Sequence, residues 1–520
     1  MSAKITGFAA GLVVFGFLAV APVFEVFQAS ASQFAAQASV PVDVEHVARS
    51  MQHVLAVLAL MVTWWVSEAV PLPATALLPA VLFPLLKISG VHGGRAVDLS
   101  LQAVLANYAH PVIYLFLGGF LLAGAMQKWK LDRRITLWLL TRGELASDTR
   151  LVLLGIMSVT AFLSMWISNT ATAAMMLPMG LGILSLMALS PGESRFGTAM
   201  MLGIAWSASI GGMGTIIGTP PNGIALGILD AALAGEPGYV RITFLDWMKF
   251  GVPLVVVFLP VAWLVILALN PPEIRHIPGG RAKMQEERSK LGPLSAGEKR
   301  AIVIFLCAVT AWVTNPFWGS LLPEAIAGQL AWVDEYAIGL GAGLLGFVVP
   351  VKLKEPQFVL EWRDTRFVDW GTLILFGGGI ALSDAMFKTG LASLIAHSFV
   401  SFLGSPPTLV MVIAVVFLID FLTEVTSNTA VTSMMVPIFI SIALTTGEDP
   451  VALTLAVALA ASLAFMLPVA TPPNALVYST GYVSIRQMVR SGFLLDIFGW
   501  ITVVGILTVV AGWIFGIVEL

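Results

Sequence analysis

A pair of matching polar motifs, each set inside a long apolar stretch, constrains this chain more than any other feature. The tripeptide Ser-Asn-Thr occupies residues 168–170 within WISNTATAAMMLP and residues 427–429 within VTSNTAVTSMMVP. The sequence Thr-Pro-Pro-Asn follows each copy, at residues 219–222 and 471–474, and a glycine pair (LFLGG, LFGGG) precedes each copy. Three matches in the same order and at nearly the same offset predict an internal duplication.

The composition indicates what kind of chain is duplicated. Of the 520 residues, 58% are hydrophobic and 11% are charged, whereas soluble domains carry about 25% charged residues. We therefore expect a polytopic helical membrane protein. The net charge of -3 favours no nucleic-acid partner, and the single cysteine excludes an intrachain disulfide. No Walker-type phosphate-binding motif is present, so ATP is not expected to drive the protein directly.

Hydropathy predicts the membrane spans, since each needs about 20 apolar residues. The first apolar run lacks a clear cleavage site and is expected to be a retained span. The predicted spans are 6–28, 52–67, 70–88, 111–127, 197–230, 246–269, 300–318, 336–352, 370–387, 449–480 and 491–517. The stretches 150–190 and 406–446, which carry the tripeptides, could each be two spans or one re-entrant hairpin.

The positive-inside rule favours the hairpins. With both stretches as hairpins, most of the 27 lysines and arginines fall on one side of the membrane. That side holds the N-terminus and the loops 128–150, 189–198, 270–300, 351–369 and 481–490. The N-terminus is then cytoplasmic and the C-terminus extracytoplasmic. Each repeat has five spans, so the second is inverted relative to the first, which is typical of secondary transporters.

The predicted fold is therefore all-α, with about eleven transmembrane helices and two re-entrant hairpins in two inverted repeats. We expect a first helix and extracytoplasmic loop over 1–50, repeat 1 over 51–270, a cytoplasmic linker over 271–298 and repeat 2 over 299–520. Repeat 1 contains the hairpin 150–190 and the broken helix 197–230. Repeat 2 contains the hairpin 406–446 and the broken helix 449–480. Segments 129–146 and 388–404 are predicted to be helices in the membrane interface, or else ordinary linkers.

The polar breaks predict ion and anion binding near the middle of the membrane. Paired prolines after residues 219 and 471 interrupt the helices, and interrupted backbone is tolerated there only inside protein or along a wet cavity. Hydroxyl and amide oxygens suit an alkali cation, while amide and hydroxyl donors suit an anion. No lysine or arginine lies near either tripeptide, so bound cations and helix dipoles would hold the anion. The alternative is that these residues only bind helices together.

A further signature lies at residues 64–79, WWVSEAVPLPATALLP. Together with the paired tripeptides and Thr-Pro-Pro-Asn breaks, it resembles the divalent anion/sodium symporter family, whose members carry dicarboxylates, citrate or sulfate. The likeness runs from about Trp64 to the C-terminus. It implies an elevator-type transporter that assembles as a homodimer, with each tripeptide at a hairpin tip facing the broken helix that follows.

The resemblance also implies the site residues. The first sodium site would use Ser164, Ser168, Asn169 and Gly218, and the second would use Thr423, Ser427, Asn428 and Ala470. The anion would contact Asn169, Thr170, Thr219, Asn428, Thr429, Thr471 and Pro472. Na⁺ is the expected coupling ion, with at least two ions bound and no organic cofactor.

Four further side chains lie in or near the stretches that carry the motifs. Glu424 stands where the first repeat has Met165, and an ionisable group at this depth is a functional hypothesis. It could supply charge near the second cation or pair with another group. Asp420 and Asp384 are expected to be buried hydrogen-bonding groups, and Trp166 is expected to pack behind a hairpin tip.

Sodium-coupled symport of C4 dicarboxylates (succinate, malate or fumarate) by alternating access is the favoured function. A sodium-independent dicarboxylate exchanger and a sulfate or citrate symporter of the same fold remain alternatives. The inverted repeats argue against an anion channel. No histidine or serine constellation within the spans suggests an enzyme. The expected location is a membrane, most simply a bacterial inner membrane.

Overall fold

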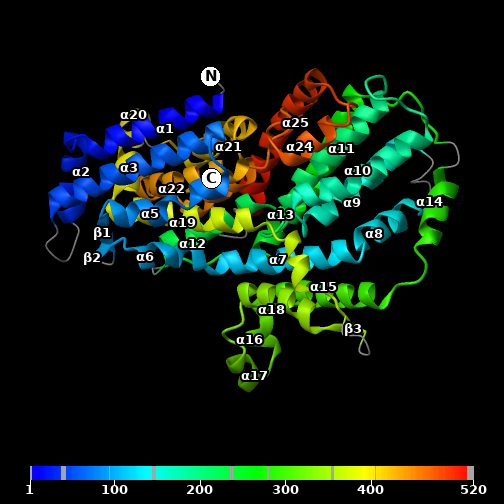
Figure 1. The fold of residues 1–520 in the computed structure, drawn as a ribbon, viewed down its shortest axis with the longest axis horizontal. Helices are drawn as coiled ribbons and strands as arrows, with labels where there is room; N and C mark the ends of the chain where they lie inside the picture. Colours follow the sequence, from blue (N-terminus) through cyan, green and yellow to red (C-terminus); the bar gives the residue numbers. More distant parts are fainter. Residues whose placement is uncertain are drawn as a thin grey trace.

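The computed structural model describes residues 3–36, 43–92, 94–142, 148–234, 236, 238–277, 280–352, 357–404 and 406–511. Helices dominate these residues (Figure 1). Their only sheets are two short hairpins, β1 (Ser89–His92) with β2 (Arg95–Asp98) and β3 (Pro350–Lys352) with β4 (Gln357–Phe358). Within the described ranges, nine helices are long and apolar enough to cross a membrane, or ten with a bent N-terminal pair. The all-α membrane class is therefore confirmed.

The bent pair replaces the single helix expected over 6–28. Helix α1 (Ala3–Val20) and helix α2 (Glu25–Ala36) meet at an angle of 64°. Pro22 stands in the connection, where it cannot donate the backbone hydrogen bond that a continuous helix needs. Both helices pack against α3 (Val44–Ser67).

The first repeat follows the predicted order. After α3 come three short helices, then α7, which begins at a proline, then α8, the hairpin and the broken helix. Their bounds are α4 (Leu72–Ala76), α5 (Leu78–Leu85), α6 (Leu101–Ala106), α7 (Pro111–Lys128), α8 (Leu131–Leu140), α9 (Thr149–Ser164), α10 (Asn169–Leu186), α11 (Arg195–Gly212), α12 (Pro220–Leu233) and α13 (Phe244–Leu269). Here α9 and α10 form the hairpin, and α11 and α12 form the broken helix.

The second repeat has the same succession. Its helices are α15 (Ala296–Thr314), α16 (Trp318–Leu321), α17 (Glu324–Gln329), α18 (Glu335–Val348), α19 (Trp370–Thr389), α20 (Leu391–Leu403), α21 (Thr408–Val425), α22 (Asn428–Thr446), α23 (Pro450–Ala460), α24 (Pro472–Tyr478) and α25 (Ile485–Ile506). Here α21 and α22 form the hairpin, and α23 and α24 form the broken helix. Helices α8 and α20 stand where interfacial helices were expected.

The linker between the repeats contains a helix, α14 (Gly280–Lys290), which the sequence analysis did not anticipate. Its Glu287 pairs with Arg133 of α8 at 2.7 Å, and its Arg288 donates to Thr141 at 2.9 Å. The linker is thus attached to the first repeat. In Figure 1, α14 lies at the right-hand edge beside α8 and α9.

The loops that were predicted to share one side of the membrane contact one another directly. The contacts are Lys128–Asp364 (2.7 Å), Arg134–Glu298 (2.6 Å), Asp148–Arg275 (3.3 Å), Ser194–Glu273 and Tyr482 Oη to the Leu189 carbonyl (2.8 Å). Burial raises the pKa of the Asp364 carboxyl, but hydrogen bonds from Lys128 and the Glu361 N–H outweigh it, and the net pKa is lowered. These contacts bring the five loops together at one end of the described structure.

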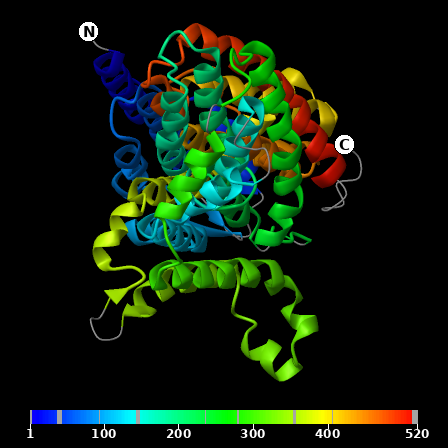
Figure 2. The same cartoon turned by 90° about the vertical axis from the view of Figure 1, so that its right-hand side faces the viewer.

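A similar contact joins loops on the opposite side, where Arg241 pairs with Glu335 at 2.9 Å. Between the two sides, buried apolar side chains form one large cluster over α7 to α13, α15, α18 and α21 to α25. A smaller cluster joins α3, α5, α19 and α20. Helices α15 to α18 form a separate layer along one edge (Figure 2), with α18 packed along α7. The hairpins and broken helices lie within the main body.

Candidate functional site

The first hairpin turns at residues 165–168, just before the first tripeptide. Helix α9 ends at Ser164, and α10 begins at Asn169. Ser168 is the N-cap of α10, and its hydroxyl accepts a hydrogen bond from the Ala171 N–H at 3.4 Å. The tripeptide therefore forms the turn and the first residues of the returning helix. The second tripeptide lies in the same place, with Ser427 as the N-cap of α22.

Each broken helix is held open by an asparagine from the Thr-Pro-Pro-Asn motif. Asn222 Nδ2 donates to the carbonyl oxygens of Gly212 (3.0 Å) and Thr215 (2.8 Å). Asn474 Nδ2 makes the matching bonds to Ala464 and Leu467, both at 3.0 Å. The Thr215 and Leu467 carbonyls also accept a turn hydrogen bond from the Gly218 and Ala470 N–H groups, so each asparagine joins backbone groups that lie at or beyond the end of regular helix. The motif asparagines thus stabilise both breaks, a role that the sequence analysis missed.

The first half-site joins the hairpin turn to the first break. With its amide nitrogen turned toward them, Asn169 donates to Ser164 Oγ (2.8 Å), the Ala208 carbonyl (3.1 Å) and the Gly218 carbonyl (3.3 Å). A Cβ added at Gly212 would lie 2.4 Å from the Asn169 side chain, so only glycine allows this approach. The structure therefore brings Ser164, Asn169 and Gly218 together, as the sequence analysis expected.

The second half-site is built in the same way. Thr423 Oγ1, at the position that matches Ser164, lies 2.6 Å from Asn428 Oδ1 and 3.0 Å from the Ala461 carbonyl. Ala470 lies buried in the second break, where its N–H donates to the Leu467 carbonyl. In both repeats, hydroxyl, amide and carbonyl oxygens gather where a hairpin turn meets a broken helix.

One contact joins turn and break in both repeats but uses different atoms in each. In the first repeat, Thr215 Oγ1 donates to the Met165 carbonyl. In the second, the Glu424 carboxylate accepts from the N–H groups of Met466 (2.7 Å) and Leu467 (2.9 Å). The break thus donates in both repeats, once from a side chain and once from the backbone. Glu424 therefore has a partner, which the sequence analysis left unidentified.

The expected anion-contacting residues differ in exposure. Thr219 and Thr471, the N-caps of the second half-helices, are buried, whereas Thr170 and Pro472 are exposed and Thr429 is half-buried. Helix α12 packs on α22 and α24 packs on α10, so the second half of each broken helix lies against the other repeat's hairpin. The two half-sites are thereby brought to the same part of the protein.

The donor chemistry of both half-sites fits an alkali cation. The side chains are neutral oxygen ligands, and alkali cations prefer hard oxygens to nitrogen or sulfur. The side-chain oxygens of Asn222 and Asn474 are buried without a hydrogen-bond partner, at matching places in the two breaks. Two equivalent buried oxygens without donors are what neutral cation sites would use.

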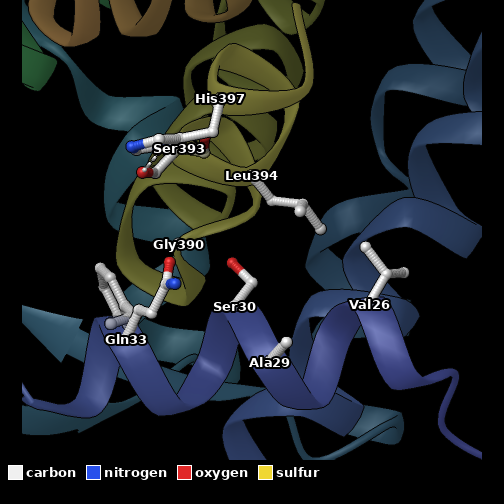
Figure 3. A pocket seen from close by; sticks show the side chains of 9 residues that line it. Val26, Ala29, Ser30, Gln33, Gly390, Ser393, Leu394 and His397 are labelled. Carbon is white, nitrogen blue, oxygen red and sulfur yellow. Dashed lines mark hydrogen bonds between the residues drawn. The ribbon is translucent and has the colours of Figure 1, made fainter. Parts of the chain in front are cut away.

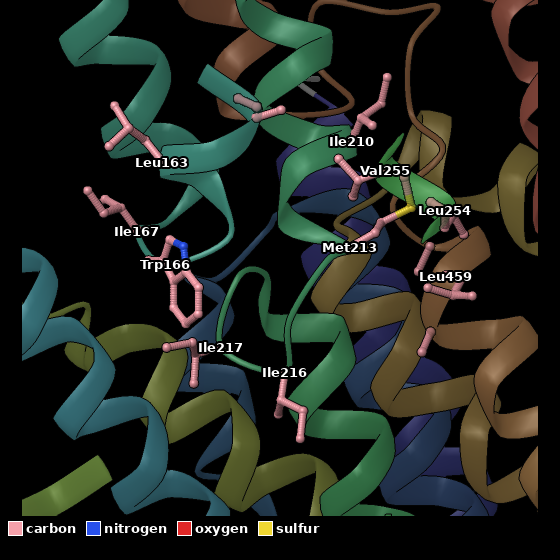
Figure 4. Packing of buried hydrophobic residues seen from close by; sticks show 14 of the residues in the cluster. Leu163, Trp166, Ile167, Ile210, Met213, Ile216, Ile217, Leu254, Val255 and Leu459 are labelled. Atoms are coloured by element: carbon pink, nitrogen blue, oxygen red, sulfur yellow. The ribbon is translucent and has the colours of Figure 1, made fainter. Parts of the chain in front are cut away.

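Trp166 packs beside the first hairpin turn. Its ring meets Phe305 of α15 edge-on at 5.2 Å and lies 6.3 Å from Phe244 of α13. Figure 4 shows Trp166 and Ile167 next to the break that carries Ile216 and Ile217. Apolar packing therefore fixes the turn from outside, while polar contacts fix it from inside.

The two aspartates considered in the sequence are hydrogen-bonded. Asp384 pairs with Lys388 at 2.7 Å, and Asp420 accepts from Trp500 Nε1 at 2.7 Å. Elsewhere, a hollow of about 220 Å³ lies between α2 and α20 (Figure 3). Its polar lining includes Ser30, Gln33, Ser393 and His397. None of the motif residues lines this hollow, so it is separate from the half-sites.

Comparison with known families gives one match that covers most of the chain. The family described as the sodium:sulfate symporter transmembrane region matches residues 38–518. A protein of Staphylococcus saprophyticus named sodium-dependent dicarboxylate transporter SdcS is 36% identical over 466 residues, which are 88% of this chain and 84% of that protein. The protein of the same name from Staphylococcus aureus is 35% identical, over 87% of this chain and 84% of its own length.

Solved structures resemble the fold at low sequence identity. The Alcanivorax borkumensis YdaH transporter superposes with a TM-score of 0.56 at 14% identity, covering 88% of this chain and 98% of its own. Neisseria gonorrhoeae MtrF superposes with a TM-score of 0.53 at 14% identity, covering 94% of this chain and 98% of its own. Both support the architecture of the chain.

Proposed function

Because the chain belongs to the sodium:sulfate symporter family, we propose that it is a secondary transporter that carries C4 dicarboxylates across the membrane together with sodium. The matching half-sites of neutral oxygens carry the proposal, because a dianion without a nearby lysine or arginine needs bound cations. The relatives' name, sodium-dependent dicarboxylate transporter, supports both the ion and the substrate class. A transporter of this kind catalyses no chemical reaction.

Each half-site would bind one sodium ion. The first would use Ser164, Ser168, Asn169 and Gly218, and the second Thr423, Ser427, Asn428 and Ala470. In the first half-site, the Asn169 amide nitrogen hydrogen-bonds to the oxygens of Ser164, Ala208 and Gly218 and holds them together. A bound cation would take the place of those bonds and draw the same oxygens inward.

The dicarboxylate would lie between the half-sites, with one carboxylate facing each tripeptide. Its contacts would be Asn169, Thr170 and Thr219 on one side and Asn428, Thr429, Thr471 and Pro472 on the other. Helices α10 and α22 both begin at the tripeptides, and the N-terminal N–H groups of helices favour anions. Two equivalent half-sites suit two equivalent charges, which is why a C4 diacid is preferred to sulfate.

Transport would proceed by alternating access, with the hairpins re-entering the membrane from opposite sides. We further propose an elevator movement in a homodimer, with the lysine- and arginine-rich loops in the cytoplasm and the C-terminus outside. A bacterial inner membrane is the proposed location, as expected for a relative of staphylococcal transporters.

Uptake of labelled succinate into proteoliposomes tests the function. We expect uptake driven by an inward sodium gradient and little uptake when potassium replaces sodium. Uptake that ignores sodium but requires dicarboxylate inside the vesicles would instead mean exchange. Silence with succinate and strong uptake of sulfate or citrate would overturn the substrate class while leaving sodium coupling in place.

A further inference from the structure

A group of buried side-chain oxygens lies beside the second half-site and has no hydrogen-bond donor. It comprises both carboxylate oxygens of Asp496, Oδ1 of Asp420 and Oγ of Ser462. All three residues are at most 1% exposed. The Asp420 carboxylate has one donor, Trp500 Nε1 at 2.7 Å, which leaves its Oδ1 unpartnered. Two carboxyl groups withdrawn from water with one donor between them and no counter-charge are costly, and most so at membrane depth.

These residues surround one stretch of chain, the end of α23 and the start of the second break. Asp420 lies one turn before Thr423 on α21, and Thr423 bonds to the carbonyl of Ala461, the residue before Ser462. On α25, a Cβ at Gly492 would lie 2.4 Å from the Phe465 carbonyl, and one at Gly499 would lie 2.9 Å from Leu463. Asp496 shares that helix face, because residues three and four apart lie on one side of a helix.

The charged surroundings of Asp496 are acidic. The charged side chains that interact electrostatically with its carboxylate are Asp420 and Glu424. Helices α13, α21 and α23 pack against α25; α23 has no charged residue, and Asp246 and Lys249 of α13 pair with each other at 2.7 Å. Among the described residues, no lysine or arginine pairs with any of the three acids. Glu424 is already bonded to two backbone N–H groups.

The first repeat has no such group. Ala161 stands at the position that matches Asp420, and it packs directly against Gly211 of the first break. The acidic group therefore belongs to the second repeat alone, and the duplication does not explain it. A group that breaks the symmetry of two otherwise matching half-sites calls for a role of its own.

We propose that Asp420, Asp496 and Ser462 form a third cation site, which takes up a sodium ion or a proton that travels with the substrate. A small monovalent cation supplies the positive charge that the protein does not, and the unpaired oxygens supply its ligands. Because α21 and residues 461–462 belong to both this site and the second half-site, occupancy of one affects the other. The inference rests on the proposed symport and adds one cation to each cycle.

The number of cations carried per succinate tests the site. Proteoliposomes are prepared with either a sodium gradient or a proton gradient. In each case, the membrane potential at which net succinate flux is zero gives the number of cations carried per succinate. Asp496→Asn and Asp420→Asn should each carry one cation fewer than the wild type. If the variant carries one sodium ion fewer per succinate, the site binds sodium. If its zero-flux potential no longer depends on the pH gradient, the site binds a proton.

Asp384→Asn is the matched control, because Asp384 pairs with Lys388 and lies outside the cluster; it should keep the wild-type number. Ser462→Ala removes one uncharged ligand, is the variant expected to fold most readily, and should weaken the affinity for the same cation several-fold. Variants that transport succinate with the wild-type number and affinity for both cations would overturn the third site. A wild type without sodium-dependent uptake would instead overturn the proposed function.

Discussion

Matching residues of the two repeats perform the same task with different atoms. Met165 offers its carbonyl to Thr215, whereas Glu424 offers its side chain to two backbone N–H groups. The tripeptides were readable from the sequence because hydroxyl and amide side chains are unusual inside apolar stretches. The role of Glu424 was not readable, because its partners are backbone groups that only the folded break exposes.

Replacing Glu424 by the residue of the other repeat tests this contact. Glu424→Met leaves the N–H groups of Met466 and Leu467 buried without an acceptor, which should cost about 1–3 kcal/mol of unfolding free energy. Thr215→Val tests the equivalent contact of the first repeat: it removes the donor to the Met165 carbonyl and should cost about 1 kcal/mol. Denaturant unfolding of the purified proteins measures both. A Glu424→Met protein as stable as the wild type would show that the contact is unimportant.

The asparagines of the two tripeptides are the most direct test of the half-sites. Asn169→Ala and Asn428→Ala should each reduce sodium-driven succinate uptake to background, because each removes a proposed ligand of both the cation and the anion. Expression and folding should stay near normal. Asn315→Ala is the control, since Asn315 bonds only to the Val333 carbonyl outside the site. Wild-type uptake by either tripeptide variant would contradict the site.

At the scale of elements, proline and glycine made the breaks predictable, and the irregular connections did not follow from hydropathy. The prolines of Thr-Pro-Pro-Asn begin α12 and α24, where the first helical residues need no N–H partner, so each break falls just before them. The bend at Pro22 was missed because an apolar run looks the same whether it is straight or bent. Helix α14 was missed because its polar surface gives no apolar periodicity; an ion pair with α8 and a hydrogen bond to Thr141 hold it in place.

Close contact between the first hairpin and the first broken helix should depend on Gly212. A methyl group there would lie 2.4 Å from the Asn169 side chain, so Gly212→Ala should displace Asn169 and abolish sodium-driven uptake. Gly182→Ala in α10 is the matched control, because a Cβ at Gly182 meets nothing within 4 Å. The two variants can be compared in one uptake assay. Equal activity of both would mean that the half-site tolerates movement of Asn169.

At the scale of the whole molecule, charge patterning grouped the loops before any contact was known. The loops richest in lysine and arginine contact one another through pairs such as Lys128–Asp364 and Asp148–Arg275. The partners in these pairs come from distant parts of the chain, so the sequence could predict the shared side but not the contacts. The acidic cluster around Asp496 was missed for the same reason, since α21 and α25 meet only in the folded protein.

Reporter fusions test the sidedness of the molecule in a bacterial host. Alkaline phosphatase fused after the C-terminus should be active, because that end is predicted to lie in the periplasm. The same reporter inserted after Lys290, in the linker, should be inactive because the linker is predicted to be cytoplasmic. The opposite pattern at either position would overturn the topology with two re-entrant hairpins.

The central claim is that two equivalent half-sites couple sodium to a dicarboxylate. The most direct test is the initial rate of succinate uptake into proteoliposomes as a function of external sodium. The proposed mechanism requires at least two sodium ions to bind before transport. The uptake rate should therefore be zero without sodium and should rise more than linearly with sodium concentration when that concentration is low. A rate that is independent of sodium, or that rises only in proportion to it, would contradict the paired sites.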